Sequence, residues 1–127
     1  MSPDRPREAP ADRFAAASLA FDLHAEAAAL RTEQAASGKP HAQKTLFKHG
    51  GRTIALFVLS AGAVLPEHAA NGTVSVQPVE GELMMSVSGE ARRLGPGSLL
   101  VMAPGTRHDV RAAAPAVFLL QVSLVPS

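Results

Sequence analysis

Residues 62–81 read GAVLPEHAANGTVSVQPVEG, and residues 97–108 read GSLLVMAPGTRH. Glycines stand at both ends of the first block, and each block carries one histidine, His68 in the first and His108 in the second. Glycine and proline at this density between short apolar runs predict strands joined by tight turns. These two blocks decide the fold that the rest of the chain has to complete.

The chain beyond Pro40 continues the same pattern of short β-favouring runs separated by Gly, Pro or Asn. Such a series predicts an all-β sandwich or barrel, and connections this short favour antiparallel pairing. No helix-length segment interrupts the series, which excludes α/β folds. The seven predicted strands are Gln43–Lys48, Thr53–Ser60, Val74–Val79, Leu83–Ser88, Ala91–Leu94, Ser98–Met102 and Ala116–Val125.

The chain before Pro40 differs in character. Residues 1–13 hold three prolines and six charges, which is typical of a flexible tail. Asp22 is placed as an N-cap and Gly38 as a C-terminal stop, so a short amphipathic helix is expected between them. We therefore divide the chain into a tail (1–13), an N-terminal segment with a short helix (14–39) and a barrel (40–127).

The run from Thr53 to Leu59 is apolar almost throughout. A strand of this kind is expected to be covered on both faces of its sheet. The helix or a second subunit could supply the outer cover, and the second choice predicts a homodimer. The sequence leaves both open.

Composition excludes several kinds of partner. The 127 residues contain no cysteine, so disulfides and thiolate metal ligands are excluded. The net charge is +1 and the basic residues are dispersed, without the basic stripe of a nucleic-acid-binding protein. No apolar run approaches the roughly 20 residues of a membrane span. Acidic residues interrupt the basic N-terminal region, so we expect a cytoplasmic protein without a signal peptide.

The spacing in the first block resembles the first motif of the cupins, G-x5-H-x-H-x3-4-E-x6-G. His68 matches the first histidine of that motif, whereas Ala70 stands in place of the second and Val74 in place of the glutamate. The second block resembles the second motif, G-x5-P-x-G-x2-H-x3-N. His108 is retained there, and Ala112 stands in the asparagine position.

The resemblance covers residues 62–112 and implies an antiparallel jelly-roll β-barrel of the RmlC-like, cupin-2 type. It also implies that His68 and His108 point into the barrel mouth, with Ala70, Val74 and Arg107 as pocket-lining neighbours. By strand alternation, Glu67 and Asp109 are expected to face outward.

A cupin enzyme typically holds Fe, Mn, Ni or Zn with three histidines and one glutamate. Here only His68 and His108 stand at ligand positions, and Val74 cannot bind a metal. The chain offers weak candidates for a further ligand at Glu67, Asn71, Gln77, His41 and His49.

Three functions follow from this pattern. The first is a small-molecule-binding or sensing barrel in which the metal site is weak or absent. The second is a metal-dependent enzyme, dioxygenase- or isomerase-like, that uses His68 and His108. The third is a barrel that serves as a dimerisation platform. The substitution pattern favours binding over catalysis.

Overall fold

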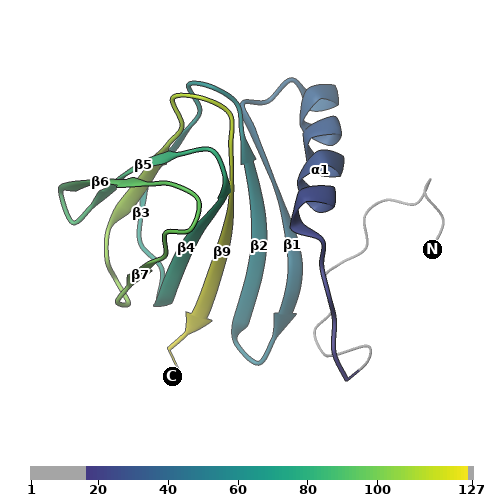
Figure 1. Cartoon of the computed structure of the whole chain (residues 1–127). Helices are drawn as coiled ribbons and strands as arrows, with labels where there is room; N and C mark the ends of the chain where they lie inside the picture. The colour runs from purple at the N-terminus through teal and green to yellow at the C-terminus, as the bar shows by residue number, and fades with distance from the viewer. Residues whose placement is uncertain (1–16, 126–127) are drawn as a thin grey trace.

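The computed structural model describes residues 17–125, and the predicted tail 1–13 lies outside this range. In the described part, one helix precedes nine strands (Figure 1). The elements are α1 (Leu23–Ser37), β1 (His41–His49), β2 (Arg52–Leu59), β3 (Val64–His68), β4 (Gly72–Glu80), β5 (Leu83–Val87), β6 (Glu90–Leu94), β7 (Leu100–Met102), β8 (His108–Arg111) and β9 (Ala116–Leu124).

The strands form two antiparallel sheets. One has the order β1-β2-β9-β4-β7 and the other the order β3-β8-β5-β6, so strands distant in sequence lie side by side. Two such sheets packed face to face are the double-sheet form of a jelly roll. The predicted all-β fold with one short preceding helix is confirmed.

Helix α1 begins and ends where the sequence predicts. The side chain of Asp22 accepts a hydrogen bond from the Ala25 N–H at 3.0 Å. At the other end, Gly38 adopts φ +70° and donates its N–H to the carbonyl of Gln34. These two caps satisfy backbone groups that a helix otherwise leaves without partners.

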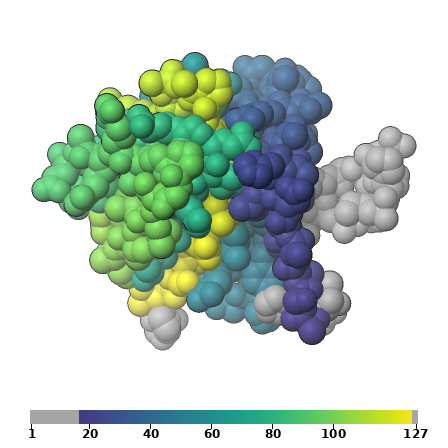
Figure 2. Space-filling model, in the orientation of Figure 1, coloured from purple at the N-terminus to yellow at the C-terminus, as the bar shows by residue number. Residues whose placement is uncertain are grey.

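The five-stranded sheet separates two hydrophobic cores. Along β2, Ala55, Phe57 and Leu59 face the inner core between the sheets, whereas Leu56 and Val58 face the helix. Ala27 and Leu30 of α1 are fully buried in the second, outer core. The helix therefore supplies the outer cover that the apolar strand requires, and the atoms of residues 17–49 form one side of the molecule (Figure 2).

The glycines that anchor the two sequence blocks occupy backbone conformations that L-residues rarely adopt. Gly62, Gly81, Gly97 and Gly105 all have φ between +73° and +91°. A residue without a Cβ reaches this region at no steric cost, so the glycine spacing records the positions of the turns.

Two strands lie outside the seven that the sequence predicts, and they carry the two histidines. β3 contains Pro66, which has no N–H for a ladder, and its pairing with β8 is irregular between Leu65 and His68. β8 is only four residues long. Both features weaken the pattern by which strands are identified in a sequence. In the described range, no helix is long and apolar enough to cross a membrane.

Candidate functional site

The two motif histidines lie side by side on neighbouring strands. His68 at the end of β3 is the register partner of His108 at the start of β8. Their ring centroids are 4.3 Å apart, with the rings inclined at 59°. His108 is 2% exposed, whereas His68 is solvent-exposed. The structure thus brings together the two residues that the sequence singles out.

Each imidazole is held by the backbone of its own strand. His68 Nδ1 lies 3.0 Å from the carbonyl oxygen of Pro66, and His108 Nδ1 lies 3.0 Å from that of Thr106. A carbonyl oxygen only accepts hydrogen bonds, so each Nδ1 must carry the proton. In the neutral ring, Nε2 is then the nitrogen with the free lone pair.

A cavity of about 300 Å³ opens beside these rings. Besides the two histidines, its wall is mostly apolar, and Phe57 and Phe118 in that wall stack at 4.7 Å with rings nearly parallel. The other lining residues are Gln43, Leu65, Pro66, Glu67, Val76, Val110 and Leu120. The site combines a hydrophobic chamber with two adjacent imidazoles.

The neighbours expected to line the pocket lie outside this wall. Val74 faces the inner core but is 3% exposed, and Ala70 packs against the same core. These side chains, with Met102 and Val122, fill the interior at this end of β4. The cavity begins at the next inward residue of β4, Val76.

Arg107 and Glu67 form an ion pair at the edge of the cavity. Arg107 Nη2 lies 2.7 Å from Glu67 Oε1, and the arginine side chain is 71% exposed. Glu67 lines the cavity, although simple alternation along the strand directs it outward. The irregular pairing of β3 interrupts the alternation before His68 and accounts for this difference. Asp109, by contrast, accepts a hydrogen bond from the N–H of Ser86.

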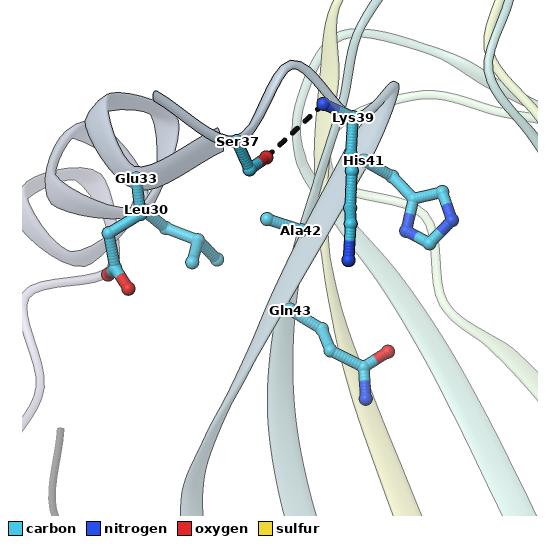
Figure 3. A pocket seen from close by; sticks show the side chains of 7 residues that line it. All are labelled: Leu30, Glu33, Ser37, Lys39, His41, Ala42 and Gln43. Carbon is cyan, nitrogen blue, oxygen red and sulfur yellow. Dashed lines mark hydrogen bonds between the residues drawn. The ribbon is translucent and has the colours of Figure 1, made fainter. Parts of the chain in front are cut away.

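Gln43 is a polar lining residue that the sequence analysis did not propose for the pocket. It is the register partner of the inward-facing Phe57, so it belongs to the inner face of β1. Figure 3 shows the Gln43 and His41 side chains on one side of β1 and Ala42 on the other, towards Leu30. No isolated sequence signal distinguishes Gln43, because its orientation depends on the register of the hairpin.

A second hollow lies between the end of α1 and β1. It measures about 390 Å³ and is lined by Leu30, Glu33, Ser37, Lys39, His41, Ala42 and Gln43 (Figure 3). The Ser37 hydroxyl donates to the Gln34 carbonyl and accepts from the Lys39 N–H at 3.2 Å. This hollow is distant in sequence from both motifs and lacks their histidine pair, so the cavity at His68 and His108 is the stronger candidate site.

The donor set at the histidine pair does not fit a resident catalytic metal. Catalytic zinc has three protein ligands, and non-haem iron enzymes use two histidines and one carboxylate. Within residues 17–125, no group of three or more His, Cys, Asp or Glu side chains could hold a metal ion. The Glu67 carboxylate is engaged by Arg107. The chemistry available without further ligands is hydrogen bonding by imidazole and burial of an apolar molecule.

Comparison with known proteins gives structural matches alone. No family model and no curated protein matches the sequence. Among solved structures, the cupin-2 domain of an XRE family transcriptional regulator from Enterobacter cloacae has 26% identity and a TM-score of 0.62, covering 70% of this chain and 100% of its own. An RmlC-like cupin from Shewanella frigidimarina has 18% identity and a TM-score of 0.64, covering 69% and 79%.

A larger enzyme shares the same architecture over part of its length. Salicylate 1,2-dioxygenase from Pseudoaminobacter salicylatoxidans matches with a TM-score of 0.72 and 15% identity, covering 81% of this chain and 34% of that one. At this identity the match concerns the fold. Together with the two-sheet jelly roll and the spacing of its two motifs, these matches show that the chain folds as a small cupin domain.

Proposed function

We propose that this protein is a small-molecule-binding or sensing cupin whose ligand occupies the cavity beside His68 and His108. The observation that carries the proposal is the cavity itself, an apolar chamber of about 300 Å³ with two adjacent imidazoles in its wall. Ligand sites typically have volumes of about 300–1,000 Å³, mostly apolar walls and a few polar groups that fix orientation.

The ligand set favours binding over catalysis. Ala70 and Val74 replace two metal ligands of the cupin motif, and the apolar packing around Val74 leaves no carboxylate on the inner face there. Two neutral imidazoles alone hold a divalent metal only modestly. Fe, Mn, Ni or Zn would therefore need ligands from outside the protein or from water.

A sensing role is supported by one structural match. The cupin-2 domain with 26% identity belongs to a transcriptional regulator. A domain of this size that binds a small molecule without transforming it is suited to report the presence of that molecule. This chain would then act through a partner or a second copy, and we place it in the cytoplasm.

The alternative is a metal-dependent cupin enzyme, dioxygenase- or isomerase-like, that uses the same two histidines. The observation in its favour is that both Nδ1 atoms are fixed by backbone carbonyls, which leaves both Nε2 atoms with free lone pairs. Metal-binding histidines are commonly oriented by such a second hydrogen bond.

The proposed function is tested by titrating the full chain with toluene and phenol while recording amide chemical shifts. We expect saturable shifts at Leu65, Phe118 and Leu120. In Leu120→Phe the larger side chain fills the cavity, and these shifts should be lost. Leu119→Phe is the matched control, because Leu119 packs against the outer core. Absence of saturable shifts with both probes in the wild type would refute the proposal.

Metal content separates the two functions. After purification without chelators, elemental analysis should find Fe, Mn, Ni and Zn far below one equivalent. Near-stoichiometric metal in the wild type that disappears in the His68→Ala/His108→Ala variant would favour the enzyme instead.

A homodimer is also proposed, although not through the strand face that the sequence suggests for it. Leu56 and Val58 on that face are fully buried under α1. A second copy would have to use another surface. Sedimentation velocity at micromolar concentration tests this, and a monomer would contradict it.

A further inference from the structure

The histidine pair carries information about the chemistry of the ligand as well as its position. This inference rests on the proposed function, since it assumes that the cavity binds a small molecule. It concerns which hydrogen-bonding groups that molecule must have.

The first step is the proton position on each ring. Both Nδ1 atoms lie 3.0 Å from a backbone carbonyl, of Pro66 for His68 and of Thr106 for His108. Because these carbonyls accept only, both neutral rings carry their proton on Nδ1. Both Nε2 atoms are therefore hydrogen-bond acceptors.

The second step is that the protein supplies no donor for these acceptors. Within the described residues, the hydrogen bonds of His68 and His108 are limited to those made by Nδ1. His108 is 2% exposed, so water has little access to its ring. A buried acceptor without a partner costs about 1–3 kcal/mol, which a donor on the ligand would recover.

The third step is the lack of a free positive charge. Arg107, the cation nearest in sequence to His108, is paired with Glu67 at 2.7 Å. The rest of the lining is apolar apart from Gln43. An anion placed in this chamber would lose its hydration and meet two acceptor nitrogens. The cavity thus disfavours carboxylates and phosphates.

The fourth step concerns shape. Phe57 and Phe118 stack with an interplanar angle of 7°, and both line the cavity. A ring compound can make offset or edge-to-face contacts with such a pair. With the two imidazole centroids 4.3 Å apart, neighbouring substituents on one ring can reach both histidines.

We infer that the ligand is an uncharged ring compound that donates hydrogen bonds from hydroxyl or N–H groups to Nε2 of His68 and His108. Phenols and cyclic alcohols belong to this class. Aromatic carboxylates and aryl phosphates do not.

The test compares phenol with anisole and benzoate at pH 8, where free imidazole is neutral. Anisole has the same ring but no hydrogen-bond donor, and benzoate replaces the hydroxyl by an anion. In titrations of the full chain followed by amide shifts, phenol should bind at least about tenfold more tightly than either. Catechol should bind more tightly than phenol if both histidines accept.

The variant His68→Leu/His108→Leu keeps apolar bulk and removes both acceptors. We expect it to bind anisole at least as well as phenol. His49→Leu, at the far end of β1, is the control and should retain the preference for phenol. If the double variant does not fold, ¹⁵N spectra of the wild-type rings replace it. They should show unprotonated Nε2 in both rings, with a shift change when phenol is added.

The outcomes separate the two proposals. Equal affinity for phenol and anisole, or tighter binding of benzoate, would overturn the inference while leaving a ligand-binding cavity in place. Spectra with a protonated Nε2 in either ring would also overturn it. Failure of all three probes to bind would contradict the proposed function and this inference with it.

Discussion

At the scale of single residues, Gly81 and Gly89 allow steric and conformational effects to be separated. Both have positive φ, +73° and +83°. A Cβ on Gly81 would collide with the carbonyl oxygen of Pro115 and lie 3.0 Å from the Cα of Ala116, whereas a Cβ on Gly89 meets nothing within 4 Å. Gly89→Ala should therefore cost only about 1–2 kcal/mol of unfolding free energy, the penalty of a left-handed L-residue.

Gly81→Ala should cost at least about 2 kcal/mol more, because backbone atoms of the loop before β9 would have to move. Chemical denaturation of both variants measures the difference. Equal losses would show that the close approach to Pro115 contributes nothing and that the motif glycine is required only for its φ.

His41 supplies a second prediction at this scale. Its Nδ1 is buried and has no hydrogen-bond partner in the described structure. His41→Phe retains a ring and removes the polar atom, so it should raise the free energy of unfolding by about 1 kcal/mol. A lower thermal midpoint for His41→Phe would contradict this, since it would mean that the nitrogen makes a favourable interaction in solution.

The residue scale also shows what a sequence can reveal about a site. His68 and His108 could be predicted because each stands at a fixed distance from turn-forming glycines. The cavity wall could not, because Phe57 and Phe118 are ordinary apolar strand residues until the pairing of β2 with β9 brings them opposite each other. Side-chain identity marks the polar groups of a site, while tertiary pairing makes its walls.

At the scale of elements, irregular strand pairing reorients polar side chains at three places. In β1, the shift between Thr45 and Phe47 sets Gln43 opposite the inward Phe57. In β4, the shift between Pro78 and Glu80 sets Glu80 opposite Val117, which faces the helix. The third shift precedes His68 in β3. One extra residue exchanges the two faces of a strand, so alternation counted along the sequence fails beyond each bulge.

Glu80 shows the consequence of its bulge. Its carboxylate accepts from His24 Nδ1 at 2.8 Å and from Arg31 at 2.9 Å, which ties α1 to the end of β4. The hydrogen bond from His24, followed by the contact with Arg31, lowers the pKa of Glu80 below its ordinary value of 4.5, although partial burial opposes the shift. The stabilisation is therefore present above pH 4.5 and is lost as pH falls through the lowered pKa.

Glu80→Gln should reduce the free energy of unfolding at pH 7 by about 0.5–1 kcal/mol, the usual range for a partly exposed pair. The difference from the wild type should shrink as pH is lowered from about 5 to about 3. Urea denaturation across this range measures it. Glu82→Gln is the control, because Glu82 contacts Arg93 at 3.4 Å with both side chains more than half exposed. A pH-independent difference for Glu80→Gln would refute the role of its charge.

At the scale of the whole molecule, the two cores share strands β2 and β9. Leu56 and Phe57 are neighbours in the chain, yet one packs under the helix and the other lines the cavity. Both strands carry alternating residues into both cores. The presence of the helix and the identity of the fold were predictable from caps and motif spacing. Its role as the cover of β2 was one of two possibilities, since an apolar strand does not specify what lies on its outer face.

This sharing of strands predicts that the helix and the jelly roll unfold together. Leu30 is 1% exposed and packs in the outer core, so Leu30→Ala should cost about 2–5 kcal/mol through lost burial and the cavity left behind. Because the same strands support the inner core, the loss should lower the stability of both cores equally. Far-UV circular dichroism reports the helix, and the methyl resonance of Met85, 1% exposed in the inner core, reports the jelly roll.

In the wild type and in Leu30→Ala, the two signals should change at one common denaturant midpoint, which is lower in the variant. Ala29→Ser, on the exposed face of the helix, should leave that midpoint within about 0.5 kcal/mol of the wild-type stability. If Leu30→Ala instead melted the helix while the Met85 resonance kept its wild-type midpoint, α1 would be an independent attachment. The outer face of β2 could then become available to a partner without loss of the cavity between the sheets.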